Sequence, residues 1–355
     1  MRRQIGVGLL LALVTVFCLA GASEAVKFRY ENLGTLGGAQ DYAAFDYKEA
    51  AINDVGQVVG ISHMAGGALH AFVKSPGQAM VDLGNIPGST ESHAPGINNS
   101  GVIGGTYLDN LGAHACKWLP LGGGIYQFQS LDDAGGSAVH GINDAGYLVG
   151  NARVSGFFHA YILPPGGNPQ DLGMLSGHLS SFATGINRTN TIVGFSYDAN
   201  AIPTACFWSP SGGSWTAAAS LFGVADSKAH AVNQTGQAVG YQRVSAASHA
   251  ILGSPGQPLL DLGTLIPGGE SLAYDINDSG SVVGWASYDD GDRAFLWTAT
   301  GGMRDLNNLV VNLPPGVILR QAQAINSRGE VAGYTTNGIF KLTPIVQPPL
   351  LLLLD

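Results

Sequence analysis

The sequence predicts an all-β protein, a seven-bladed β-propeller of four-stranded blades in which an N-terminal strand closes the ring. Three observations predict this fold. A short motif recurs at a nearly constant spacing, each period contains four strand signals, and the two ends of the chain hold complementary parts of one period. The motif has the form Ile-Asn-Asp-Xaa-Gly, and its Asn recurs every 44 to 49 residues, at Asn53, Asn98, Asn143, Asn187, Asn233, Asn277 and Asn326.

Each copy of the motif predicts a tight turn between two strands. An apolar residue precedes the Asn, and a residue that tolerates positive φ stands three positions after it. These structural turn positions are Gly56, Gly101, Gly146, Asn190, Gly236, Gly280 and Gly329. The Asn is expected to hydrogen-bond the backbone of its own turn. A short apolar pair and another glycine follow in all seven copies, so each copy predicts a β-hairpin.

Two further strands complete each period. The third is centred on an Ala, as in His70-Ala71-Phe72, and the fourth ends in Asp-Leu-Gly at 82–84, 171–173 and 261–263, with looser versions elsewhere. The last repeat stops after its third strand, at 339–342, whereas the first repeat is preceded by a stray fourth-type strand at 28–34. We therefore predict that 28–33 pairs with 339–342, because this pairing leaves no open sheet edge in the ring.

The propeller is predicted to occupy residues 26–344. Residues 1–25 read as a signal peptide, with Arg2 and Arg3 before an apolar core and small residues at a cleavage site. The expected location is therefore secreted, either extracellular or periplasmic. Residues 345–355 form a Pro/Leu-rich tail that we expect to be disordered, and its five leucines are too few to span a bilayer.

Composition and charge limit the partners. Charged residues make up only 12% of the chain, against 52 glycines and 45% hydrophobic residues, which favours many short strands with tight turns and a substantial core. The formal net charge of −9 makes nucleic acid and anionic membrane surfaces poor partners. We expect a monomer with no membrane span in the mature chain.

The repeats also resemble a known family. Asn-Leu-Gly-Thr-Leu-Gly-Gly at 32–38, Asp-Leu-Gly-Thr-Leu at 261–265, the Ile-Asn-Asp-Xaa-Gly turns and His70-Ala71-Phe72 are similar to the HAF-repeat family of extracellular repeat proteins. The resemblance covers residues 28–343. It implies export and a repeat fold, and it brings no established activity or catalytic residues.

Cysteine, histidine and tryptophan often serve in binding or catalysis, but in this chain several of them occupy repeated positions, which favours structural roles. Cys116 and Cys206 hold one position in non-adjacent repeats, so we expect two buried free thiols rather than a disulfide. Four histidines share another position, at least one blade apart, so they cannot share an ion; they are His70, His114, His159 and His249. Trp118, Trp208 and Trp297 are interpreted as blade packing rather than a carbohydrate-stacking platform.

Candidate ligand-binding residues come from the loops where the repeats differ. These are the carboxylates between the second and third strands: Asp109, Asp198, Asp289, Asp290 and Asp292. The alternative to a binding site is a solvated acidic rim, in which these carboxylates are ordinary surface charges. No metal site or cofactor is predicted; calcium is the one alternative, because 288–292 is rich in oxygen ligands although it lacks EF-hand spacing.

The predicted function is a secreted, non-enzymatic binding or surface-interaction propeller for an unknown extracellular ligand or protein. Every repeated residue has a structural explanation, which favours this reading. The alternative is an extracellular hydrolase or lyase that acts on a polysaccharide-like substrate with acidic residues at the channel mouth. In either case we expect specificity on the face of the variable loops, opposite the Asn turns, around the channel mouth.

Overall fold

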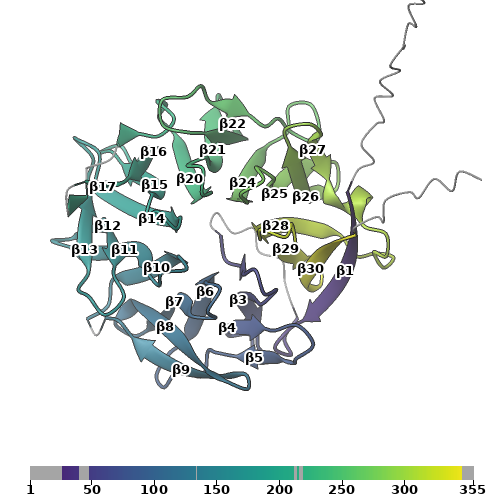
Figure 1. The fold of residues 1–355 in the computed structure, drawn as a ribbon, viewed down its shortest axis with the longest axis horizontal. Helices are drawn as coiled ribbons and strands as arrows, with labels where there is room; N and C mark the ends of the chain where they lie inside the picture. The colour runs from purple at the N-terminus through teal and green to yellow at the C-terminus, as the bar shows by residue number, and fades with distance from the viewer. Residues whose placement is uncertain (1–25, 40–47, 133, 212–213, 216–218, 346–355) are drawn as a thin grey trace, which may run out of the picture.

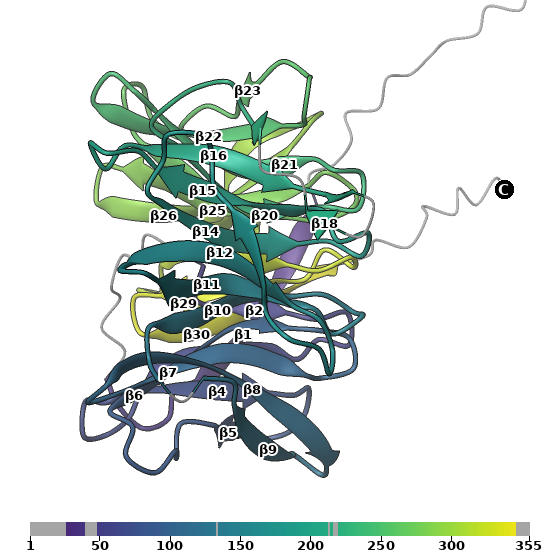
Figure 2. The ribbon, with the colours of Figure 1, turned by 90° about the vertical axis from the view of Figure 1, so that its left-hand side faces the viewer.

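The computed structural model describes residues 26–39, 48–132, 134–211, 214–215 and 219–345. The predicted signal peptide (1–25) and residues 346–355 of the predicted tail lie outside the described residues, whereas Ile345, predicted to belong to the tail, ends the last strand. Seven four-stranded antiparallel sheets stand around a central axis as the blades of a β-propeller (Figure 1), as predicted. Seen edge-on, the hairpins of the blades end on two opposite faces (Figure 2).

In each of blades 1 to 6 the strands run outward from the axis in chain order. Blade 1 holds β2 (Ala51–Ile52), β3 (Val58–His63), β4 (Leu69–Lys74) and β5 (Met80–Asp82). Blade 2 holds β6 (Glu91–Ile97), β7 (Ile103–Asp109), β8 (Gly112–Gly122) and β9 (Ile125–Ser130). Blade 3 holds β10 (Ser137–Ile142), β11 (Leu148–Val154), β12 (Phe157–Leu163) and β13 (Gln170–Gly173).

The second half of the ring repeats this order. Blade 4 holds β14 (Ser180–Ile186), β15 (Ile192–Tyr197), β16 (Pro203–Trp208) and β19 (Ala219–Ser220). Blade 5 holds β20 (Ser227–Val232), β21 (Ala238–Val244), β22 (Ala247–Gly253) and β23 (Leu260–Asp261). Blade 6 holds β24 (Ser271–Ile276), β25 (Val282–Tyr288), β26 (Gly291–Thr298) and β27 (Gly302–Asp305).

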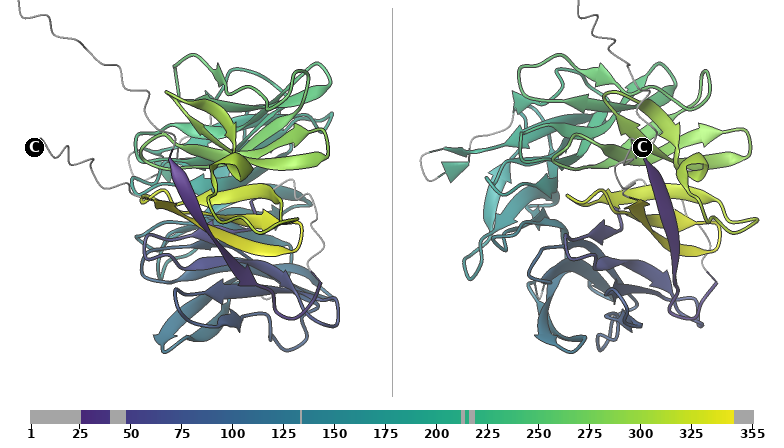
Figure 3. Two further views of the ribbon diagram at one scale, coloured as in Figure 1. Left: turned by 90° about the vertical axis from the view of Figure 1, so that its right-hand side faces the viewer. Right: turned by 45° about the vertical axis from the view of Figure 1, so that its right-hand side comes forward.

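Blade 7 joins the two ends of the chain. It holds β28 (Leu319–Ile325), β29 (Val331–Thr335), β30 (Gly338–Ile345) and, as its outermost strand, β1 (Lys27–Gly34). Figure 3 shows β1 along the outer edge of this blade. Tyr30 is paired with Leu342 and Asn32 with Phe340, which confirms the predicted closure. Phe28, Tyr30 and Leu33 are buried by it.

Two elements were not predicted. A short hairpin of β17 (Pro210–Ser211) and β18 (Ser214–Trp215) extends blade 4 before its last strand. The 3-10 helix η1 (Leu306–Leu309) follows β27, and the Asp305 side chain caps it by accepting from the Asn307 amide. Among the described residues, no helix is long and apolar enough to cross a membrane.

The motif turns have the predicted backbone. The six turn glycines have φ between 75° and 83°, and Asn190, which replaces glycine in the fourth copy, has φ of 60°. Each motif Asn Oδ1 accepts from the backbone N–H four residues later, at 2.9–3.0 Å. The predicted contact of the Asn with its own turn is therefore confirmed.

The glycine after the apolar pair has a different reason. A Cβ at Gly240 would lie 1.9 Å from the carbonyl oxygen of Lys228 on the neighbouring inner strand. In blades 2, 3, 4, 6 and 7, a Cβ at the equivalent glycine would lie 1.9–2.1 Å from the corresponding carbonyl oxygen of its own inner strand. Only glycine fits, because the inner strand bulges at this level and brings its backbone close to the second strand.

Repeated polar residues join neighbouring blades. A buried Ser at the start of the inner strand accepts from the Ala N–H in the third strand of the preceding blade, at 2.8–3.1 Å; these serines are Ser92, Ser137, Ser181, Ser227 and Ser271. Within a blade, the repeated His contacts the Asp of Asp-Leu-Gly, as in His159 Nδ1 to Asp171 Oδ2 at 2.7 Å. His70 and His249 do the same, whereas His114 contacts Asp109.

The repeated apolar residues pack between the blades. Trp118, Trp208 and Trp297 are at most 8% exposed, which confirms their interpretation as packing residues. Cys116 and Cys206 are buried free thiols, as predicted, and burial raises the pKa of both. Protonated, buried thiols are poor nucleophiles.

The ring closure can be tested by deleting residues 26–34. Losing three buried side chains at ~1.5–3 kcal/mol each should cost about 5 kcal/mol or more and expose the edge of β30. Thermal unfolding and size-exclusion chromatography should show a lower melting temperature and aggregation relative to the chain that begins at 26. An unchanged melting temperature would contradict the closed ring.

The turn backbone can be tested at Gly280, where φ is 77°. Gly280→Val should cost on the order of 1–2 kcal/mol in urea unfolding, because a β-branched residue is strained at this φ. Gly280→Asn should cost much less, since Asn190 already adopts this conformation. Equal losses would remove the backbone explanation.

Candidate functional site

The motif Asn side chains form a closed ring around the axis. Each Asn Nδ2 donates to the backbone carbonyl of the motif Asn in the next blade, at 3.0–3.3 Å, and Asn326 completes the circle by donating to Asn53. These asparagines are 2–6% exposed. One residue type therefore builds the turn with its oxygen and ties adjacent blades with its nitrogen.

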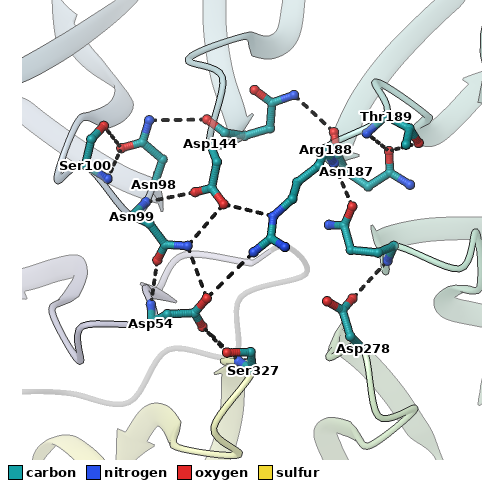
Figure 4. Close-up of polar contacts among 12 residues, drawn as sticks. Asp54, Asn98, Asn99, Ser100, Asp144, Asn187, Arg188, Thr189, Asp278 and Ser327 are labelled. Atoms are coloured by element: carbon teal, nitrogen blue, oxygen red, sulfur yellow. Dashed lines mark hydrogen bonds and ion pairs between the residues drawn. The ribbon is translucent and has the colours of Figure 1, made fainter.

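The residue after each Asn lines the mouth of the channel on this face, which we call the Asn-turn face. The seven residues differ: Asp54, Asn99, Asp144, Arg188, Gln234, Asp278 and Ser327. They surround a cavity of about 200 Å³. Arg188 reaches across it, with Nε 3.0 Å from Asp144 Oδ2 and Nη2 3.8 Å from Asp54 Oδ2 (Figure 4). The mouth therefore already contains its own cation.

Asp54 is held as a carboxylate in this network. Burial alone would raise its pKa, but hydrogen bonds from Ser327 and Asn99 and the charge of Arg188 outweigh that effect and lower it. Ser327 donates through both its backbone N–H and its hydroxyl, at 3.0 and 2.7 Å. A carboxylate in this state is a hydrogen-bond acceptor and not a general acid.

The channel continues inward past a ring of apolar residues. The residue before each Asn lies between the mouth and the interior: Ile52, Ile97, Ile142, Ile186, Val232, Ile276 and Ile325. A second cavity of about 120 Å³ lies beyond them and shares Lys48, His140, Thr184 and His230 with a third. The cavities thus follow one another along the axis.

The interior of the channel is lined through β-bulges on the inner strands. The strand register skips the third residue before the motif Asn in five blades; the skipped residues are His140, Thr184, His230, Tyr274 and Gln323. In blade 2 the skipped residues are Ala94 and Pro95. A bulge re-aims a side chain without changing the rest of the strand. His140, Thr184 and His230, from three consecutive blades, line the channel cavities.

The third cavity, which we call the channel pocket, has a volume of about 210 Å³. It is lined by Lys48, His140, Asn151, Phe182, Thr184, Phe195, Tyr197 and His230. Phe182 and Phe195 stack with centroids 5.1 Å apart and planes 17° apart. Tyr197 stands edge-on to both rings. A concave, largely apolar site with a few polar groups is typical of small-molecule binding.

The two imidazoles of the pocket are neutral at pH 7. Burial lowers the pKa of His230, the contact with Ala273 raises it, and the charges of Lys228 and Lys48 lower it, for a net value of about 4. His230 Nδ1 lies 2.8 Å from the Ala273 carbonyl oxygen, so Nδ1 carries the proton and Nε2 is an acceptor. Burial also lowers the pKa of His140, whose Nε2 lies 2.7 Å from Asn151 Oδ1.

Acidic side chains also lie near the pocket, each in contact with a basic group. Glu49 Oε2 lies 3.1 Å from His93 Nδ1, and Glu91 Oε2 lies 3.6 Å from His93 Nε2. Burial lowers the pKa of His93, but the contacts with both glutamates outweigh burial and the net shift is upward. Asp275 Oδ2 lies 2.9 Å from Lys48 Nζ and also accepts from the Ile325 N–H.

The carboxylates proposed from the sequence lie elsewhere, at the tips of the hairpins between second and third strands. Asp109 and Asp198 each accept from backbone N–H groups of their own turn, which lowers their pKa. Asp290 accepts from the Arg293 guanidinium, which lowers its pKa, and Arg320 donates to the carbonyl oxygens of Asp290 and Asp292. Asp289 adjoins Asp290 in the same turn. The three turns belong to blades 2, 4 and 6, so the structure does not bring them together.

Within the described residues, no cluster of three or more His, Cys, Asp or Glu side chains could hold a metal ion. The pocket residues were not predicted, because they lie neither at the repeated motif positions nor in the variable loops. The signal that could have found them is the column three residues before the motif Asn. This column changes chemistry from blade to blade, while the positions on either side of it hold small residues in most copies.

The Asn ring can be tested with Asn187→Asp. The carboxylate keeps the turn acceptor but loses the Nδ2 donor to the Asn233 carbonyl, so we expect a loss of about 1–3 kcal/mol in urea unfolding. Asn200→Asp is the matched control, because its amide makes only an exposed contact with Asp198. Equal, small losses for both variants would contradict a structural ring.

The two kinds of channel histidine should respond to pH with opposite signs. The folded pKa of His93 is raised, so its stabilisation is complete below the unfolded pKa of about 6.5 and is lost as pH rises through the folded value. The folded pKa of His230 is lowered, so the wild-type chain gains stability as pH rises from about 4 to about 6.5. In urea unfolding, His93→Gln should therefore cost more at pH 5 than at pH 8, and His230→Gln more at pH 8. The same trend for both would contradict these assignments.

Comparisons with known proteins bear on the fold. No family model and no curated protein matches the sequence, so the resemblance to HAF-repeat proteins stays a prediction. The structure is similar to the BP39L lectin from Burkholderia pseudomallei, with TM-score 0.50, 12% identity, and 85% of this chain and 96% of the lectin covered. It is also similar to AofleA from Arthrobotrys oligospora, with TM-score 0.49, 9% identity and coverages of 79% and 88%. At these identities the likeness concerns the fold alone.

Proposed function

We propose that the protein is a secreted, non-enzymatic binding propeller whose small-molecule ligand occupies the channel pocket. The proposal is carried by the bulged positions of the inner strands. At these positions, three consecutive blades place His140, Thr184 and His230 beside an aromatic wall. Secretion rests on the composition of residues 1–25.

The division between constant and variable residues supports binding at this place. The constant residues are used by the fold: the Asn side chains in the ring, the glycines in turns and close contacts, the serines between blades. The residues at the bulges are released from ladder pairing and differ among blades. Side chains that differ among repeats and converge on one cavity can recognise a single asymmetric ligand.

The electrostatics favour binding over hydrolysis. A glycosidase of the usual kind needs a carboxylic acid with a raised pKa opposite a second carboxylate. Asp54, Asp109, Asp198 and Asp290 instead have lowered pKa values. The channel pocket is lined by neutral imidazoles, aromatic rings, an amide and a hydroxyl, and Lys48 is the one charged residue in the described part of its lining.

The proposal can be tested by ligand-observed NMR with single-ring probes such as benzamide, phenol and phenylacetate on the chain that begins at 26. Phe182→Ala removes one ring of the wall, and we expect binding of any positive probe to weaken about tenfold, equivalent to ~1.4 kcal/mol. The control is the triple variant Asp289→Ala, Asp290→Ala and Asp292→Ala, which should leave this binding unchanged. A probe whose affinity falls in the triple variant and is unchanged by Phe182→Ala would instead place the binding site in the loops.

A further inference from the structure

We infer that the ligand of the channel pocket pairs a flat apolar ring with a carboxylate, and that Lys48 and Lys228 determine this specificity. This inference rests on the proposed function and names its ligand class. The first step is the shape of the wall. Phe182 and Phe195 stack, and Tyr197 meets them edge-on at 5.9 and 5.4 Å. A wall of stacked and edge-on rings favours a flat partner.

The second step is the position of the two ammonium groups. Lys48 lines the pocket, and its Nζ contacts Asp275 at 2.9 Å. An ammonium has three donors, so a second acceptor can join that contact. Lys228 is only 8% exposed, and its Nζ lies 4.8 Å from the Phe195 centroid and 5.8 Å from that of Tyr197. Its charge therefore lies against two rings of the pocket wall.

The charges of Lys48 and Lys228 both act on a group inside the pocket. After burial, the charges of Lys228 and Lys48 are what lower the pKa of His230, and His230 lines the cavity. Lys228 also hydrogen-bonds Tyr241, whose ring lies 6.0 Å from its Nζ. Two cations, one from the segment before β2 and one from β20, thus act on one cavity wall.

The fourth step is the distribution of acidic groups. Among the described residues that line the pocket, none is acidic, although the chain has a formal net charge of −9. The carboxylates nearby are engaged by other groups, since Glu49 contacts His93 and Asp275 contacts Lys48. Lys48 is the one cation among the described lining residues, so a singly charged carboxylate fits this wall better than a phosphate dianion, which needs more donors.

The test compares benzoate, phenylacetate and 3-phenylpropionate with their primary amides, by NMR titration at pH 7 and low salt. We expect the best carboxylate to bind at least tenfold more tightly than its amide. The variant Lys48→Met with Asp275→Asn removes the charge without leaving Asp275 unpaired, and Lys228→Met removes the second cation. Each should reduce the ratio of carboxylate affinity to amide affinity at least fivefold.

Lys117→Met is the control, because Lys117 lies on β8 and does not line the pocket. The wild-type preference should also fall as salt rises from 50 to 500 mM, a readout that does not depend on a variant folding. Equal binding of amides and carboxylates, or a preference that survives both lysine changes, overturns the charge inference and leaves the pocket assignment standing. No binding of either series overturns both.

Discussion

The hydrogen bond from each motif Asn to the next motif Asn is the interaction on which the ring depends. Because the same side chain also closes its own turn, the position of every turn is fixed relative to its neighbour. The bond from Asn326 to Asn53 applies the same constraint across the chain ends, on the inside, while β1 closes the sheet on the outside. Inner and outer closure together define seven equivalent blade positions, so the residues that differ between blades can be placed accurately around one axis.

The fold concentrates variation at the bulges. A bulged residue has no partner in the strand register, so cross-strand pairing does not restrict its identity. The glycine on the second strand leaves room for the inner-strand carbonyl that comes close at this level. Blades 3 to 5 use this freedom for His140, Thr184 and His230, which face rings and ammonium groups. In the same channel, Glu49 and Glu91 contact His93. The channel is therefore chemically asymmetric although its scaffold is nearly symmetric.

Much of the scaffold could be predicted from the sequence, because its causes are local and repeated. Gly280 and Asn190 mark a turn that needs positive φ, and the stray strand at 28–34 has a single place where it completes a sheet. The Nδ2 bonds could not be predicted, since they join residues about 45 positions apart whose contact depends on how the blades dock. The pocket was missed for a related reason. A bulge does not alter the alternation of apolar and polar residues, so nothing local shows that His140 and His230 face one cavity.

The most direct test of the account is backbone amide chemical-shift mapping with the tightest-binding member of the aromatic carboxylate series. The account predicts that the largest shifts fall on the bulged segments around His140, Thr184 and His230, with smaller shifts at Phe195 and Tyr197. The amide chemical shifts of the Asn turns should not change, because the hydrogen-bonded ring fixes these turns. Largest shifts at 289–292 or at the Asn-turn mouth, with none in blades 3 to 5, would contradict it.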